Sequence, residues 1–385
     1  MIEKPHIVIA GAGILGLTTA WVIAKNLSAS NTPYEITIVA EYGPHSPTMN
    51  ANLTNLAKYT SPWAGAHFRP FPSKNEKELK EMKLTRLTLQ KFKQLSQTSP
   101  ESSIKFVKGI EYLENPDEHY SKFAYGWSEE IDNFKHKTDK PGFLGVEYDT
   151  WVVNSPIYLQ FLYRKLSIEY SNINFLKIRL DSLKQINDLF PKTQSRTAPI
   201  IINCTGNGLQ YNGGFDPECY PIRGQTLLIK PPPSPQKNGT NQKCQYLDKT
   251  ITYQLKDGSW SFVIPRPLNG GVILGGMKQI GDSFLGINES DTEQLIEMGK
   301  KYFPDLMTQD VNVNNGKPFF EILRVNVGLR PARKTGLRLD VEQYDNKQYV
   351  INNYGAGGMG YELSYGAAIK VYEKLMEILG RRHHL

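Results

Sequence analysis

The chain is poor in cysteine: Cys204, Cys219 and Cys244 are the only three in 385 residues. Their number and irregular spacing match no zinc-binding pattern, and they do not predict a framework of disulfides. Cys204 closely follows a run of three isoleucines, so we expect a buried thiol that packs as a small hydrophobic side chain. The sequence therefore predicts no metal site.

Long hydrophobic runs are also missing. No apolar stretch approaches the roughly 20 residues that a helix needs to span a bilayer. The N-terminus lacks the basic segment and cleavage site of a signal peptide, and its first apolar run leads into a glycine-rich turn instead. We therefore expect an intracellular protein without a membrane partner.

The positive charge lacks the pattern of a nucleic-acid surface. The formal net charge is +7, but lysines and glutamates are interspersed along residues 73–97. This pattern is typical of the solvated face of an amphipathic helix. No base-stacking or groove-reading module accompanies the charge, so we expect no nucleic-acid partner.

What the chain does have is two glycine-rich turns, one near each end. The first is Gly11-Ala12-Gly13-Ile14-Leu15-Gly16, after the apolar strand Ile7–Ala10. Such a turn lets backbone N–H groups approach a pyrophosphate at a helix N-terminus. The second, Gly355–Gly360, follows another apolar strand about 340 residues later. Turns at both ends indicate one cofactor domain built from both termini, which favours a tightly held flavin over a dissociating nicotinamide.

An acidic residue follows the second predicted strand, Glu35–Ala40. In dinucleotide-binding folds an acid at this strand end binds the ribose hydroxyls, about 20 residues after the glycines. Glu41 lies about 25 residues beyond Gly16, and the polar insert Asn26–Pro33 accounts for the excess. The alternative is that Glu41 only caps a turn.

The remaining patterns predict an interleaved fold. Strands near residues 7, 37, 201 and 350 carry the turns, and helices are expected at 73–97, 156–169 and 361–379. Residues 100–147 read as irregular apart from a strand at 104–107. A β-rich half has strands at 225–230, 261–264 and 271–275, with a polar loop at 231–242.

We therefore predict an α/β fold of the two-domain α+β type. A Rossmann-like FAD-binding domain would comprise residues 1–67, 148–220 and 328–385. Residues 68–147 and 221–327 would form a substrate-binding domain around an antiparallel sheet.

Five segments together resemble the FAD-dependent D-amino-acid oxidases, especially the fungal members. They are Gly11–Gly16, Thr60–Ala66, Asn203–Gly206, Val327–Arg333 and Asn353–Gly360. The first segment is shared by many dinucleotide-binding proteins, whereas the second, fourth and fifth in this order are specific. The resemblance covers nearly the whole chain. It implies FAD as cofactor, a D-amino acid and O2 as small-molecule partners, and a homodimer.

The resemblance implies roles for residues at matching positions. Arg330, in Gly-Leu-Arg-Pro, would hold the substrate carboxylate through two parallel hydrogen bonds. The backbone carbonyl of Gly358 would accept a hydrogen bond from the substrate amine, and Arg333 would be structural. No side-chain base is required at the α-carbon, because hydride would pass directly to flavin N5. Asn352 stands where the family usually has histidine, so a role of that histidine near the flavin is lost or replaced.

The same resemblance implies a set of FAD-contacting residues. They are Gly11, Ala12, Gly13, Ile14, Leu15, Gly16, Glu41, Tyr42, Ser61, Ala64, Gly65, Ala66, His67, Cys204, Thr205, Gly206, Arg330, Gly355, Gly357, Gly358, Met359, Gly360, Tyr361 and Glu362. His67 stands where many fungal members have asparagine. It would hydrogen-bond flavin O4, reach the substrate side chain, or be purely structural.

The resemblance implies a tyrosine hydroxyl that covers the substrate, but the sequence does not identify which tyrosine supplies it. The family often has a tyrosine just before an Ile-Pro strand, where this chain has Phe262. Tyr253 or Tyr246 would supply the hydroxyl instead, and we expect Tyr253 and Phe262 to contact the substrate. Together with Trp260 they favour small to medium apolar side chains.

Besides a more distantly related glycine or sarcosine oxidase, three alternatives stay open. A D-aspartate oxidase shares this scaffold but needs extra cations, for which His67, Arg69, Lys249 and Lys278 are the candidates. A nicotinamide dehydrogenase would leave the Gly355–Gly360 turn and Arg330 unexplained. A non-catalytic flavoprotein is the third, and the intact Arg330 argues against it.

The C-terminal sequence bears on location. The chain ends Arg381-Arg382-His383-His384-Leu385, which keeps the basic-then-leucine pattern of a peroxisomal tripeptide. His383 in place of a small residue weakens the match. We expect a peroxisomal protein, and otherwise a cytoplasmic one.

Overall fold

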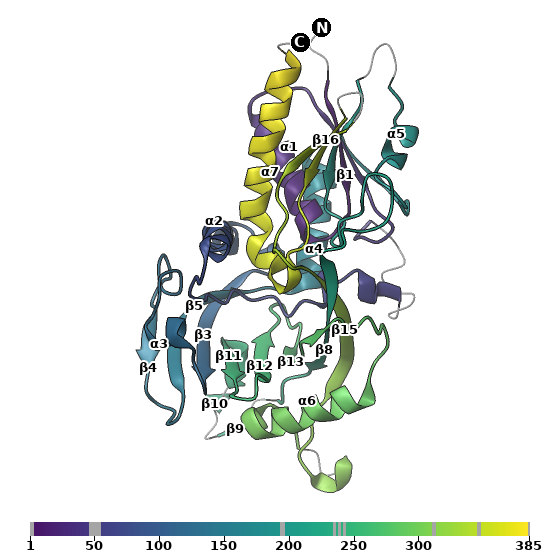
Figure 1. Cartoon of the computed structure of the whole chain (residues 1–385). Coiled ribbons are helices and arrows are strands. Elements are labelled where there is room, and N and C mark those ends of the chain that lie inside the picture. Colours follow the sequence, from purple (N-terminus) through teal and green to yellow (C-terminus); the bar gives the residue numbers. More distant parts are fainter. Residues whose placement is uncertain are drawn as a thin grey trace.

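Two β-sheets and the helices packed on them make up the protein (Figure 1). The computed structural model describes residues 4–45, 55–192, 197–233, 236–237, 240–241, 244–309, 313–344 and 348–383. The predicted α/β class with two interleaved sheets is confirmed.

The first sheet has six strands. Their order is β16 (Val341–Tyr344), β17 (Gln348–Asn352), β7 (Ile200–Asn203), β1 (His6–Ala10), β2 (Glu35–Val39) and β6 (Ile173–Leu176). All neighbours are parallel except the edge strand β16. Runs of isoleucine and valine form these strands because helices and loops cover both faces of the sheet. The strands predicted near residues 7, 37, 201 and 350 are therefore adjacent.

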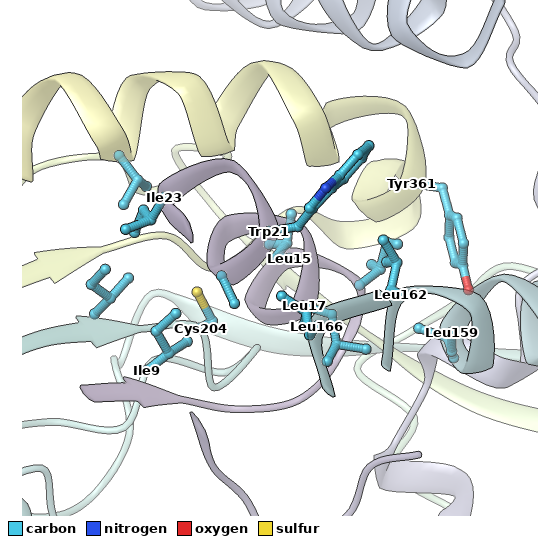
Figure 2. Close-up of a cluster of buried hydrophobic side chains, with 14 of the residues drawn as sticks. Ile9, Leu15, Leu17, Trp21, Ile23, Leu159, Leu162, Leu166, Cys204 and Tyr361 are labelled. Atoms are coloured by element: carbon cyan, nitrogen blue, oxygen red, sulfur yellow. The ribbon is translucent and has the colours of Figure 1, made fainter. Parts of the chain in front are cut away.

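Three helices pack together beside this sheet. α1 (Ile14–Ala29) contacts both α4 (Ser155–Glu169) and α7 (Gly360–His383). Figure 2 shows Leu17 of α1 next to leucines of α4, with Cys204 beneath the helix, whereas the Trp21 ring points toward α7. Cys204 is 7% exposed, which confirms the packed thiol expected from the sequence. α2 (Glu76–Thr98) lies across the start of α7 and confirms the helix expected at 73–97.

The second sheet has nine strands. Eight follow in the order β14 (Gln279–Ile280), β8 (Cys219–Ile229), β13 (Val272–Gly275), β12 (Trp260–Pro265), β11 (Lys249–Gln254), β3 (Lys105–Leu113), β5 (Leu144–Val152) and β4 (Lys135–Lys137), and β15 (Ile322–Arg333) pairs with β8. α6 (Glu289–Tyr302) packs against β8, β12 and β13. The short helices are α3 (Glu118–Ser121) and α5 (Gln185–Leu189), with 3-10 turns at Asn55–Lys58, Ser61–Trp63, Pro100–Ser102, Gln245–Leu247, Pro304–Leu306, Asn314–Gly316 and Gly357–Met359.

Three expectations about this half were wrong. The sheet is mixed rather than antiparallel, because β11 and β3 pair in parallel. The stretch 100–147 is not irregular, since β3 and the start of β5 form a regular antiparallel pair within it. The polar loop at 231–242 contains a short hairpin of β9 (Gln236–Lys237) and β10 (Thr240–Asn241).

The domain division at residues 147, 220 and 327 stays a prediction. Each of these positions lies inside a strand: β5, β8 and β15 respectively. The long strands β8 and β15 run from the nine-stranded sheet toward the six-stranded sheet, so the two halves share continuous backbone (Figure 1). None of the helices among the described residues has the length and apolar character needed to cross a membrane.

A buried ion pair fastens α6 to the second sheet. Arg223 of β8 is 0% exposed, and its guanidinium donates to Asp291 Oδ2 of α6 at 2.6 Å. Asp291→Ala would leave this cation buried without its counter-charge, so we expect a loss of about 3–5 kcal/mol in the free energy of unfolding. Denaturant unfolding followed by circular dichroism measures this loss. Glu321→Ala, which breaks the exposed pair with Lys230 at 2.8 Å, should cost less than about 1 kcal/mol. Equal losses in the two variants would contradict this account.

Candidate active site

A large cavity lies between the two sheets. Its volume is about 1180 Å³, and its wall includes both glycine turns, the Thr60–His67 segment and strands of the second sheet. Pockets for drug-sized ligands have volumes of about 300–1,000 Å³. The cavity therefore has room for a dinucleotide together with a small substrate.

The first glycine turn brings backbone close to the cavity. Gly11 has φ +108°, and a Cβ there would meet the Cys204 carbonyl oxygen at 2.4 Å. A Cβ on Gly16 would meet the Gly11 carbonyl oxygen at 1.9 Å. A side chain at Gly11 would collide with the backbone that follows β7, and one at Gly16 would push α1 away from the end of β1, so both positions require glycine. The turn leaves the N-terminus of α1, which favours anions, at the cavity wall.

The second glycine turn lies against the first. A Cβ on Gly360 would meet Ile14 Cγ2 at 3.3 Å, which places the starts of α7 and α1 next to each other. Gly355 and Gly357 have φ values of +81° and +56°, which only glycine adopts readily. One cavity wall is therefore assembled from both ends of the chain, as the two turns predicted.

Hydrogen bonds from several elements hold residues 59–64, which contact the first glycine turn and the start of α7. The Tyr59 hydroxyl donates to the Ala12 carbonyl at 3.0 Å, and Ser61 Oγ accepts from the Ile14 amide at 3.0 Å. The Tyr361 hydroxyl donates to the Ser61 carbonyl at 3.0 Å. The guanidinium of Arg266 donates to the carbonyl of Ala64 at 3.0 Å. The backbone of residues 59–64 is thus held by the first glycine turn, by α7 and by Arg266, which follows β12.

Acidic and aromatic side chains line the part of the cavity that lies at the ends of strands β2 and β6. Glu41 and Tyr42 follow β2, and residues 178–181 follow the neighbouring strand β6. This is the strand end at which a dinucleotide ribose is expected. Glu41 therefore lies where the sequence placed it, although its contact with a ribose stays a prediction.

Arg330 of β15 lines the cavity and has no acidic partner among the described residues. Among the described residues its guanidinium makes one hydrogen bond, to the Met277 carbonyl at 3.2 Å, and no ion pair. A Cβ on Gly224 of β8 would meet the guanidinium at 2.4 Å, so this glycine makes the space that the arginine fills. Gly358 lies on its other side, since a Cβ there would meet Arg330 Cδ at 3.7 Å. Burial lowers the pKa of Arg330, because no nearby charge compensates the cation.

Three strands present alternate residues to the cavity. β12 contributes Trp260, Phe262 and Ile264; β8 contributes Ile222, Gly224 and Thr226; β15 contributes Asn326, Gly328 and Arg330. This period of two follows from the pleat of a strand. The sequence analysis did not predict most of these residues, although the spacing from Arg330 or Phe262 indicates them.

The expectation that a tyrosine covers the substrate was wrong for both candidates. Neither Tyr253 nor Tyr246 lines the cavity. Tyr253 pairs with Ser261 across the sheet, and its side chain lies on the face opposite Phe262. Its ring stacks on Tyr112 at 5.1 Å, and its hydroxyl accepts from Lys140 Nζ at 2.7 Å. Tyr246 packs edge-on to Phe303 in the same core cluster.

His67 and Arg69 line the cavity near Trp260. Burial and the nearby Arg69 lower the pKa of His67 to about 3, so the imidazole is neutral. The Arg69 guanidinium lies 4.6 Å from the Trp260 ring centre and pairs with Glu111 at 3.2 Å. Lys278 lines the cavity and is exposed, whereas Lys249 does not line it. The charge of Arg69 is therefore already balanced by a protein acid.

Two residues near the second glycine turn are structural. Arg333, which we expected to be structural, pairs with Asp216 at 2.8 Å. Asn352 is 1% exposed and donates to Asp340 Oδ1 at 2.8 Å, outside the cavity wall. The asparagine in place of the family histidine therefore belongs to the packing of β17.

Nearly all of the proposed FAD-contacting residues lie together in the cavity wall, and Gly16, behind the first turn, is the exception. Residues that the sequence analysis missed include Phe71, Ile222, Gly224, Thr226, Met277 and Asn326. The two glycine turns, the N-terminus of α1 and the volume of the cavity all fit FAD. The individual FAD contacts stay predictions.

Comparison with known proteins agrees with this geometry. Residues 6–373 match the family model described as FAD dependent oxidoreductase. The chain is 33% identical to a D-aspartate oxidase of Talaromyces thermophilus, over 97% of this chain and 95% of that protein. It is 32% identical to a D-amino-acid oxidase of Schizosaccharomyces pombe, over 95% of each.

Solved structures share the fold at low sequence identity. A glycine oxidase of Bacillus cereus matches with a TM-score of 0.63 at 13% identity, over 98% of this chain and 96% of that one. An L-alpha-glycerophosphate oxidase of Mycoplasma pneumoniae with FAD bound matches with a TM-score of 0.62 at 14% identity, over 97% and 95%. On the family match and the curated relatives, the chain belongs to the FAD dependent oxidoreductase family.

Proposed function

We propose that this protein oxidises D-amino acids, with FAD as cofactor and O2 as the final acceptor. The observation that carries the proposal is the Arg330 guanidinium, which faces the cavity without an acidic partner among the described residues. A shielded cation of this kind is costly unless a ligand neutralises it. The carboxylate of an amino acid supplies that charge in a shape that fits the planar guanidinium.

The neighbours of Arg330 support the orientation of the substrate. With the carboxylate on Arg330, the amine would lie toward Gly358, which is adjacent to that side chain. FAD, when bound, accepts the hydride that leaves the α-carbon, and O2 then takes both electrons to give hydrogen peroxide. The resulting imino acid hydrolyses to a 2-oxo acid and ammonia. The preference for the D enantiomer rests on the curated relatives.

Neutral substrates fit the charges of the cavity better than acidic ones. A second substrate carboxylate needs a free cation inside the cavity, but Arg69 is paired with Glu111, His67 is neutral, and Lys278 is exposed to solvent. Trp260, Phe262 and Ile264 form an apolar wall beside them. The second candidate is a D-aspartate oxidase, which the relative from Talaromyces thermophilus and the exposed Lys278 at the cavity favour.

We also infer a peroxisomal location and a homodimer. The location rests on the C-terminal sequence and on the proposed peroxide product. His384 and Leu385 of that sequence lie outside the described residues. The homodimer is consistent with exposed apolar side chains at Ile280, Phe284 and Ile287, and light scattering of the purified protein would measure it.

Arg330→Ala should lower kcat/KM for D-alanine by roughly 100-fold or more. Two charge-assisted hydrogen bonds to the substrate carboxylate are lost, which together contribute about 3 kcal/mol. Steady-state peroxide assays measure the change, and the flavin absorption of the purified variant should stay near normal. Arg330→Lys keeps the charge without the two-pronged geometry, so its loss should be intermediate. Unchanged kinetics in Arg330→Ala would remove this residue from the substrate site.

D-alanine should have a kcat/KM at least about tenfold above that of D-aspartate. Burying a second carboxylate without a free cation costs more than about 1.4 kcal/mol. Parallel assays with both substrates at one pH measure the ratio. A higher value for D-aspartate would establish the second candidate, and His67→Asn would then show whether the imidazole reads the side chain.

Fusing residues 376–385 to a fluorescent protein should direct it to peroxisomes in a yeast host. The receptor reads the C-terminal tripeptide as an address, independently of the fold. The same fusion ending at residue 382 serves as the control. A diffuse cytosolic signal from the complete fusion would refute the address.

A further inference from the structure

One of the residues expected to contact FAD is a buried carboxylate whose chemistry the account above leaves unused. Glu362 lies in the first turn of α7, is 9% exposed and lines the cavity. Its Oε1 accepts a hydrogen bond from the Arg69 amide at 2.8 Å, and its Oε2 has no hydrogen-bond partner among the described residues. Buried carboxylates normally have a paired charge or several donors. Among the described residues, Glu362 Oε2 therefore remains available to accept a hydrogen bond or a proton from a ligand in the cavity.

Glu362 lies close in sequence to the expected amine site. Gly358 is four residues before it, in the 3-10 turn Gly357–Met359 that leads directly into α7, and Gly358 lies against Arg330. A substrate whose carboxylate binds Arg330 and whose amine points to Gly358 would bring its nitrogen toward this carboxylate. At neutral pH that nitrogen is an ammonium, which cannot release a hydride from the adjacent carbon until a proton has left.

No other group in the cavity is suited to take that proton. The cavity has two further acidic residues, Glu41 and Asp181, and both lie at the opposite end, after β2 and β6. His67 is too weak a base, because burial lowers its pKa to about 3. Three tyrosines line the cavity, Tyr42, Tyr59 and Tyr361, and burial raises the pKa of each phenol, so these groups stay protonated; Tyr253 and Tyr246 lie outside the cavity.

The charges around Glu362 come from three other elements and the segment before α2. Arg69 faces it from residues 67–71, Arg86 from α2, Glu111 from β3 and Tyr148 from β5. The two arginines favour the carboxylate form, whereas Glu111 and above all burial disfavour it. Burial dominates and raises the pKa of Glu362 to about 7. A base with this pKa is half-ionised near neutrality, which suits proton transfer at that pH.

We propose that Glu362 accepts the proton of the substrate ammonium and so prepares the amine for oxidation. This inference rests on the proposed function. In the step, an N–H bond of the ammonium breaks, an O–H bond forms on Glu362, and the electron pair stays on nitrogen. That pair then forms the C=N bond as hydride leaves the α-carbon for FAD. The proton on Glu362 returns to solvent after the product has left.

Glu362→Gln tests the step, because glutamine keeps the shape and can still accept from the Arg69 amide but cannot take a proton. In the wild type, kcat/KM for D-alanine should fall as the pH drops through about 7, where Glu362 becomes protonated. In the variant, kcat/KM should be lower by roughly 100-fold or more at neutral pH. The deficit should shrink as the pH rises, because the substrate then arrives already deprotonated.

Glu81→Gln is the matched control, since burial also raises the pKa of Glu81 and its carboxylate accepts from the Leu337 amide at 3.2 Å, away from the cavity. Its pH profile should equal that of the wild type. A wild-type profile in Glu362→Gln, or a deficit that is the same at every pH, would overturn the role of Glu362. A wild type that oxidises no D-amino acid would overturn the proposed function itself.

Infrared titration adds a readout without turnover. A carboxylic-acid band with a midpoint near pH 7 should disappear in Glu362→Gln, and its persistence would contradict the assignment.

Discussion

The site depends on a cation that the fold shields without neutralising. Three other arginines in the interior have acidic partners: Arg223 pairs with Asp291, Arg69 with Glu111 and Arg333 with Asp216. Arg86 and Arg266 are buried without an ion pair among the described residues, but each donates to two backbone carbonyls and neither lines the cavity. Within the part of the chain that the structure describes, Arg330 has one hydrogen-bond acceptor, the Met277 carbonyl, and the missing side chain of Gly224 makes the space for it. Such a charge costs stability, and the rigid pairing of β15 with β8 holds it in place. The protein therefore pays in folding free energy for a pocket that is complementary to a carboxylate.

The interleaved chain places Arg330 in the same cavity wall as the two glycine turns that would hold the cofactor. β8 and β15 extend from the second sheet to the cavity, while the two glycine turns reach the same cavity from opposite ends of the chain. Gly360 packs against Ile14, so the two glycine turns lie next to each other. The proposed substrate and cofactor sites thus share one cavity wall, and Glu362 lies just after the second glycine turn.

Much of this could be predicted from the sequence, because strands followed by glycine turns are local patterns. The parallel strands, α2, the two turns and Arg330 are of this kind. What the sequence did not reveal depends on which face of a strand a residue occupies. Tyr253 was expected at the substrate, but the pleat places it opposite Phe262. The extra cation at Arg69 could be named, but its partner Glu111 lies 42 residues away on β3. The unusual pKa of Glu362 likewise arises from tertiary burial alone.

Anaerobic reduction of the bound flavin tests the central claim most directly. Purified protein should be yellow, and D-alanine added without oxygen should bleach the flavin absorption, whereas L-alanine should leave it unchanged. Admitting air should then restore the colour and release hydrogen peroxide. This result would show that substrate electrons pass to the cofactor in the cavity beside Arg330. A colourless protein, or a flavin that no D-amino acid reduces, would contradict the account.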